Sequence, residues 1–101
     1  FGDGMLKRTL THASDICGHI LLSLDSEDAV NEVFNIGGET MSLKQIAESI
    51  AAKYDVRVKY TDWPEQAYRL ESGDTIFCSD KLDSTVPYCR DTSFASWLED
   101  L

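Results

Sequence analysis

The chain has 101 residues, of which 43% are hydrophobic and 27% are charged. This length suits one small domain rather than two, and the composition is ordinary for a globular protein. Its 18 acidic and 9 basic residues give a formal net charge of -9. That charge argues against nucleic acid and anionic membranes as partners, because phosphate groups are bound by basic faces. An acidic chain can still bind a nucleotide, since one or two arginine side chains are enough to hold a diphosphate.

The patterning predicts a soluble, cytoplasmic protein. The longest strongly apolar run is only residues 20–22, far short of the ~18 apolar residues of a membrane span. The first residue is Phe1 rather than Met, so we expect the chain to begin inside a longer one. No basic stretch followed by an apolar one occurs at the start, so we predict no signal peptide. Cys17, Cys78 and Cys89 form no C-x-x-C pair. This disfavours a disulfide scaffold or structural zinc site and favours reduced thiols.

The N-terminal part is expected to hold a turn, an extended stretch and a helix. Residues 1–4 combine two glycines with an aspartate, which is typical of a turn, and residues 6–13 follow as an extended or loop segment. Ser14 or Asp15 then caps a helix that runs to about Leu24. The apolar stripe of this helix consists of Ile16, Ile20, Leu21 and Leu24.

A short apolar strand and a second helix are predicted next. Residues 32–36 have the composition of a buried parallel strand, which two glycines then end. Ser42 and Gln45 have the spacing of a capping box, so a helix should begin here and run to about Tyr54. Its predicted buried stripe consists of Leu43, Ile46, Ala47, Ile50 and Ala51.

The C-terminal half has shorter signals. Residues 56–60 alternate and predict a half-exposed strand, and residues 76–78 form the core of another. Residues 65–69 and 79–82 are expected to form short helical turns or plain turns. Residues 92–93 cap a last amphipathic helix. The alternation of helices with strands indicates an α/β fold.

The residues alone define no catalytic, metal or cofactor site. His12 and His19 lie seven residues apart, but no further ligands at metal-binding spacing accompany them. Neither glycine cluster has the spacing of a dinucleotide fingerprint. Sets of the Ser-His-Asp or Cys-His type meet only in space and cannot be selected from the sequence.

Several motifs nevertheless occur in a recognisable order. Residues 2–15 contain the pattern G-D-G-x-x-x-R-x-x-x-H-x-x-D, which includes Arg8, His12 and Asp15. The other segments are V-F-N-I-G-G at 33–38, S-L-K-Q-I-A at 42–47, W-P-E at 63–65, E-S-G-D at 71–74 and S-D-K-L at 79–82. They are spread along most of the chain, from residue 2 to residue 82. Their order resembles the C-terminal part of extended short-chain dehydrogenase/reductases, the NAD-dependent sugar-nucleotide epimerases and dehydratases.

The resemblance implies an α/β fold that is the C-terminal part of a Rossmann-type epimerase. Residues 1–38 would be the end of the Rossmann half, with a loop, its last helix and its last strand, and residues 39–101 a small α/β substrate-binding domain. NAD or NADP would lie on the missing N-terminal Rossmann domain of the full-length parent, and none would be bound by this part alone. No tyrosine here has a lysine four residues later, so the family's catalytic Tyr-x-x-x-Lys pair is also expected there. Homodimerisation is common in this family.

The resemblance also nominates three substrate-binding residues. Arg8 matches the family arginine that contacts the diphosphate of the sugar nucleotide, a role that suits a guanidinium because it binds phosphate oxygens in pairs. The alternative for Arg8 is an ion pair with an acidic neighbour. Arg69 lies near a second family arginine, although its spacing to Asp74 is longer than the family's, and Asp74 is expected to touch the ribose. Residues 9–14 depart from the family's usual residues and leave the substrate class open.

The implied function is therefore that of the C-terminal substrate-binding portion of an NAD(P)-dependent nucleoside-diphosphate-sugar epimerase or dehydratase. Two alternatives stay open. One is a non-catalytic module that binds a nucleotide sugar, and the other is a small independent α/β interaction protein.

Overall fold

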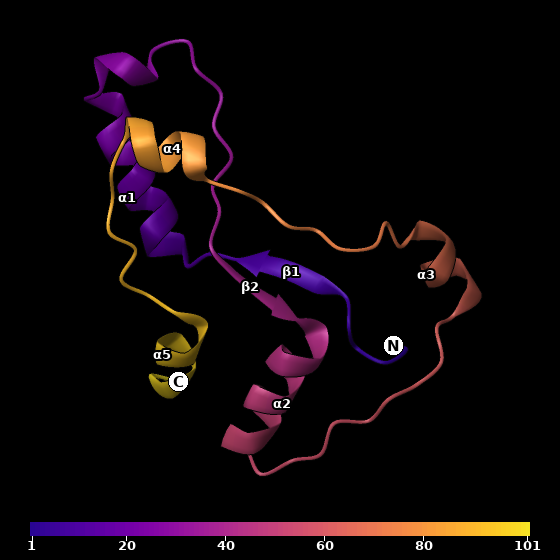
Figure 1. Cartoon of the computed structure of the whole chain (residues 1–101). Helices are drawn as coiled ribbons and strands as arrows, with labels where there is room; N and C mark the ends of the chain where they lie inside the picture. Colours follow the sequence, from indigo (N-terminus) through magenta and orange to yellow (C-terminus); the bar gives the residue numbers. More distant parts are fainter. The chain divides into compact units, whose positions relative to one another are not determined.

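The computed structural model describes residues 1–101 and shows a small mixed α/β protein (Figure 1). Two short strands, β1 (Lys7–Leu10) and β2 (Glu39–Ser42), form an antiparallel sheet. The helices are α1 (Ala13–Leu24), α2 (Leu43–Lys53), α3 (Glu65–Leu70), α4 (Asp80–Thr85) and α5 (Phe94–Glu99), with a 3-10 turn at Glu27–Ala29. None of them has both the length and the apolar character needed to cross a bilayer.

The chain divides into two compact units, each built from segments that are distant in the sequence. Unit 1 consists of Phe1–Arg8 and Thr40–Ile76, and unit 2 consists of Thr9–Glu39 and Phe77–Leu101. Unit 1 therefore contains α2 and α3, and unit 2 contains α1, α4 and α5. The predicted domains 1–38 and 39–101 concern a longer protein and stay a prediction.

In unit 1, α2 begins where the sequence predicts. The Ser42 hydroxyl accepts a hydrogen bond from the Gln45 N–H at 3.1 Å, and the Gln45 side chain accepts one from the Ser42 N–H at 2.8 Å. Two further N–H groups of the first turn donate to the carbonyls of Gly4 and Leu6. The N–H groups that a helix start leaves unpaired thus find partners, and the predicted capping box and the end near Tyr54 are confirmed.

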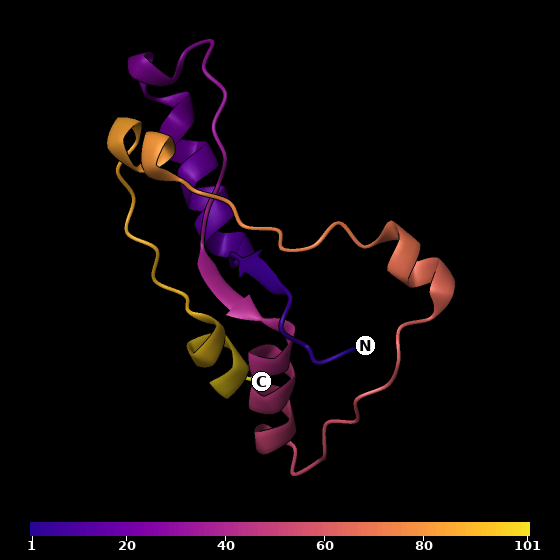
Figure 2. The same cartoon turned by 45° about the vertical axis from the view of Figure 1, so that its right-hand side comes forward.

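In unit 2, α1 and α4 lie side by side in both views (Figure 1 and Figure 2). The cap of α1 differs from the prediction, because the His12 side chain, rather than Ser14 or Asp15, accepts the hydrogen bond of the first turn. The start of α5 is as predicted, with Ser93 as the capping residue. Its partner in the capping box is Ser96, which takes the place that a Glu or Gln usually fills.

The predicted apolar stripe of α1 does not face the interior of unit 2. Ile20, Leu21 and Leu24 are 51, 64 and 76% exposed, whereas the buried residues of this helix are Asp15 and His19. Asp15 and His19 instead face the side chains of Tyr88 and Asp83. The Tyr88 ring packs against Gly18 so closely that a Cβ atom added there would lie 2.5 Å from it.

Three predicted strands are absent. The sheet contains only β1 and β2, so residues 32–36, 56–60 and 76–78 have no partner strand. A strand is defined by hydrogen bonds to its neighbour, and a favourable composition cannot replace that neighbour. Near 76–78, the only pairing is one isolated parallel bridge between Arg8 and Thr75. In the first segment, the Val33 carbonyl accepts a hydrogen bond from the Lys81 ammonium instead.

Candidate functional site

Arg8, the principal predicted substrate residue, lies in β1 and is held by the segment that follows α3. Its Nη2 donates to both carboxylate oxygens of Glu71, at 3.0 and 3.2 Å. Its Nη1 donates to the carbonyls of Gly73 and Lys7, each at 2.9 Å. The side chain keeps 27% of its surface exposed. Hydrogen bonds to Lys7, Glu71 and Gly73 therefore hold the guanidinium, while part of the side chain stays accessible to solvent.

The segment around Arg8 owes its shape to backbone bonds with β1. Gly73 adopts a φ of +86°, a conformation that suits glycine, and its N–H donates to Glu71. The Asp74 carboxylate accepts a hydrogen bond from the Lys7 N–H at 2.7 Å, and the Thr75 N–H donates to the Lys7 carbonyl. The structure thus brings the predicted site residues Arg8 and Asp74 together within unit 1.

Arg69, the third predicted residue, is placed differently. It lies in α3, where its guanidinium pairs with Glu65 one turn away and both side chains are largely exposed. Exposed pairs of this kind stabilise a helix by only ~0.3–0.5 kcal/mol. The structure does not bring Arg69 into the contacts of Arg8 and Asp74.

The charges around Arg8 favour an anionic ligand less than an arginine alone would. The Glu71 carboxylate neutralises the charge of Arg8. An ion pair of this kind with an acidic neighbour is the alternative to substrate binding that the sequence leaves open for Arg8. An anionic ligand would have to replace the Glu71 carboxylate or share the guanidinium with it. The sequence resemblance does not assign Glu71 to the site, although this residue opens the E-S-G-D motif at 71–74.

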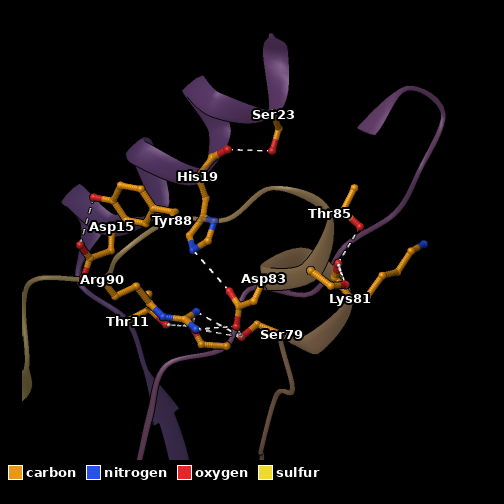
Figure 3. Close-up of polar contacts among 12 residues, drawn as sticks. Thr11, Asp15, His19, Ser23, Ser79, Lys81, Asp83, Thr85, Tyr88 and Arg90 are labelled. Atoms are coloured by element: carbon orange, nitrogen blue, oxygen red, sulfur yellow. Dashed lines mark hydrogen bonds and ion pairs between the residues drawn. The ribbon is translucent and has the colours of Figure 1, made fainter. Parts of the chain in front are cut away.

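A second polar cluster, in unit 2, has Asp83 at its centre (Figure 3). One carboxylate oxygen, Oδ2, accepts hydrogen bonds from Arg90 and from the Ser79 hydroxyl, each at 2.7 Å. Arg90 also donates to the Gly37 carbonyl. Burial works against ionisation of Asp83, but the hydrogen bonds from Ser79 and Arg90 and the charge of Arg90 outweigh it. They hold the pKa of this carboxyl below its ordinary value.

His19 faces this cluster from α1 and is 1% exposed. Its Nε2 lies 3.9 Å from Asp83 Oδ1, which is too long for a hydrogen bond. Neither ring nitrogen has a partner, and Asp83 Oδ1 has none either. An unpaired buried polar group typically costs ~1–3 kcal/mol, so the ring is held here by packing, including a contact with the Tyr88 ring at 4.8 Å between centroids.

Tyr88 contacts the His19 ring and also has an acidic partner, Asp15. The tyrosine hydroxyl donates to Asp15 at 3.4 Å. Burial and the nearby Asp15 charge raise the pKa of Tyr88. A hydrogen bond to Asp91 and the charge of that carboxylate raise the pKa of the neighbouring Cys89. The Cys89 thiol therefore carries less thiolate at neutral pH than an ordinary cysteine, and a nucleophilic role is disfavoured.

The order of groups in the unit 2 cluster does not suit nucleophilic catalysis. In a catalytic triad the histidine lies between the acid and the nucleophile. Here Asp83 lies between Ser79 and His19, and the Ser79 hydroxyl donates to the carboxylate (Figure 3). The cluster instead ties α1, α4 and the segments at Gly37 and Arg90 together. The sequence gives no motif for it, because its members meet only in the fold.

A third feature is a shallow depression in unit 1, lined by Gly2, Tyr60, Thr61 and Asp62, with a volume of about 400 Å³. The Gly2 N–H donates to the Thr61 carbonyl at 2.8 Å, which joins its two sides. The ring of Trp63 packs next to it, with its centroid 5.4 Å from that of Phe1 and 6.3 Å from that of Tyr68.

Comparisons with protein-family models, curated proteins and solved structures find no match for this chain.

Proposed function

We propose that this chain is the substrate-binding portion of an NAD(P)-dependent nucleoside-diphosphate-sugar epimerase or dehydratase, in which Arg8 binds the diphosphate. The observation that carries the proposal is the meeting of Arg8 and Asp74 around β1. The Asp74 carboxylate accepts the Lys7 N–H, and Arg8 donates to the Gly73 carbonyl. The sequence resemblance assigns both residues to the same ligand.

The pairing of Arg8 with Glu71 is compatible with the chemistry of this role. The two carboxylate oxygens lie 3.0 and 3.2 Å from Nη2. A phosphate group offers oxygens of similar spacing to a guanidinium. The Glu71 carboxylate thus occupies a position that a phosphate would take in the bound state, and it keeps the side chain oriented meanwhile.

The proposal assigns the redox chemistry to a Rossmann portion outside this chain. That portion would hold NAD or NADP and the Tyr-x-x-x-Lys pair, while this chain would hold and orient the sugar nucleotide. A cytoplasmic location is part of the proposal, and it is supported by the three cysteines, which are all free.

The reading frame upstream of the codon for Phe1 gives the first test. We expect it to encode a glycine-rich dinucleotide fingerprint and a Tyr-x-x-x-Lys pair, over roughly the length of one Rossmann domain. A frame without either motif would reject the enzyme and leave the non-catalytic binding module as the better function.

Calorimetric titration with UDP-, dTDP- and GDP-sugars tests the role of Arg8. We expect Arg8→Ala to raise the dissociation constant about tenfold or more, because hydrogen bonds to charged groups are the strong ones. Glu71→Gln should lower it, since it frees the guanidinium. The matched control is Arg57→Ala, an exposed arginine of the same unit. Equal affinities of wild type, Arg8→Ala and Glu71→Gln would remove Arg8 from the site.

A further inference from the structure

The side of α1 that points away from the rest of unit 2 carries exposed apolar side chains. This outer face consists of Cys17, Ile20, Leu21 and Leu24. We propose that the outer face docks a helix of a separate polypeptide, which is apolar on one side and bordered by basic residues. The inference goes beyond the proposed function and stands without it, because Arg8, Glu71 and Asp74 all belong to unit 1.

The spacing of the outer face is that of a contact between helices. Its members follow one another at intervals of three and four residues, which places them on one side of the helix. The buried residues Asp15 and His19 lie on the opposite side. Single exposed apolar residues are ordinary on a protein surface, whereas a continuous apolar stripe marks an interaction site. An amphipathic helix laid along such a stripe is a common mode of recognition.

The charge of the chain is concentrated in the unit that contains this face. Unit 2 has 11 acidic residues and two basic ones, which gives a formal charge of -9, whereas unit 1 has seven of each and is neutral. The two basic residues of unit 2 are both used internally, since Lys81 pairs with Glu32 and Arg90 pairs with Asp83. A basic partner is therefore complementary to unit 2 as a whole.

The C-terminal end of α1 adds a local reason for a basic partner. Asp25, Glu27 and Asp28 follow the helix directly, all three are exposed, and none of them forms an ion pair. The last turn of α1 contains no basic residue, although the negative end of the helix dipole favours a cation there. Lysine or arginine side chains of a docked helix would supply the missing positive charge at this end.

The same charges disfavour a second copy of this chain as the occupant. Two outer faces in contact would bring two acidic units together, and like charges across an interface oppose association. The occupant that fits both the stripe and its charge is therefore a helix with leucine-like residues on one side and lysine or arginine beside them.

Two synthetic helical peptides test the inference. Both carry leucine at the spacing of one helix face and exceed the ~12–15 residues below which isolated helices are marginal. One peptide has lysine at the remaining positions and the other has glutamate. Amide resonances of the chain are followed during titration with each. We expect saturable shifts at Ile20, Leu21 and Leu24 with the Leu/Lys peptide and none with the Leu/Glu peptide.

Variants separate a specific contact from general attraction of a cationic peptide to an acidic chain. Leu21→Ser combined with Leu24→Ser should weaken binding about tenfold or more, through loss of apolar burial. Both leucines are largely exposed, so the unfolding midpoint should stay unchanged. The matched control is Tyr68→Ser combined with Leu70→Ser, which removes two exposed apolar side chains of α3 in unit 1. Asp25→Asn combined with Asp28→Asn should weaken binding about fivefold.

Several results would overturn the inference. They are the absence of saturable shifts with the Leu/Lys peptide, equal binding of both peptides, and unchanged binding after substitution of both leucines. Dimerisation of the chain that the leucine substitutions abolish would assign the face to a second copy. Loss of peptide binding in a longer form of the chain would assign the face to another part of the same polypeptide. Arg8→Ala should not alter these titrations, so the proposed function can fail independently.

Discussion

Asp83 organises the polar contacts of unit 2 through one carboxylate oxygen. Oδ2 receives both Arg90 and Ser79, while Oδ1 faces the unpaired His19 ring. Ser79 is buried, Arg90 and Asp83 are partly buried, and these three side chains pair with one another. The His19 ring is buried with no hydrogen-bond partner. The side chain of Asp83 itself is 36% exposed, so water screens part of this attraction and its contribution is moderate.

Asp83→Asn should lower the free energy of unfolding by about 1 kcal/mol near neutral pH, since it removes the charge that Arg90 pairs with. The pKa of Asp83 lies below its ordinary value of 3.8. Its stabilising contribution is therefore present above that value and is lost as the pH falls through the lowered pKa. Urea unfolding at neutral and acid pH should show the variant and the wild type converging in acid. Asp28→Asn, at an exposed aspartate of the same unit, is the control, and a difference that persists unchanged in acid would contradict the assignment.

The sequence predicted helix ends better than strands or helix faces, and the reason is how local each signal is. The capping box at Ser42 and the cap at Ser93 are made within four residues, so the sequence indicates both helix starts. A strand at 32–36 depends on a neighbour elsewhere in the chain, and this structure supplies none. The face that α1 buries depends on what packs on it, and the neighbour here is the ring of Tyr88.

The candidate site shows the same difference between local signals and contacts that form only in the fold. Arg8 and Asp74 were named through their place in sequence motifs, and the fold brings them together. The carboxylate of Glu71 was not predicted as the partner of Arg8, because the two residues lie 63 positions apart and the chain offers 18 acidic residues. The cluster at Asp83 joins residues from α1, α4 and the segment before α5, so no local sequence pattern predicts it.

At Gly18, the packing of α1 against Tyr88 should reverse the usual preference of helices for alanine over glycine. Alanine usually stabilises a helix interior by ~1 kcal/mol relative to glycine. Here the added Cβ would lie 2.5 Å from the Tyr88 ring, and forcing atoms into a packed site costs ~1–3 kcal/mol. We expect Gly18→Ala to destabilise the chain by about 1 kcal/mol in chemical denaturation. In the background of Tyr88→Ala the same change should become stabilising, and a stabilising effect in both backgrounds would show that the ring does not constrain α1.

For the whole molecule, charge is the dominant property, and it opposes the ligand of the proposed function. The formal net charge of -9 repels an anionic nucleotide sugar over distances comparable to the Debye length of ~10 Å at 0.1 M salt. Arg8 attracts the diphosphate only at contact distance, and its own side chain is mostly covered. Salt therefore screens this attraction less than it screens the long-range repulsion.

Raising the ionic strength from about 0.01 M to about 0.15 M should therefore leave the affinity for a nucleotide sugar unchanged or increase it, because the screened term is mainly repulsive. A basic phosphate site behaves in the opposite way and loses affinity steeply as salt is added. Calorimetric titration at both ionic strengths measures the difference. A steep loss of nucleotide-sugar affinity with salt would mean that a local cluster of cations, rather than Arg8 alone against an acidic surface, binds the diphosphate.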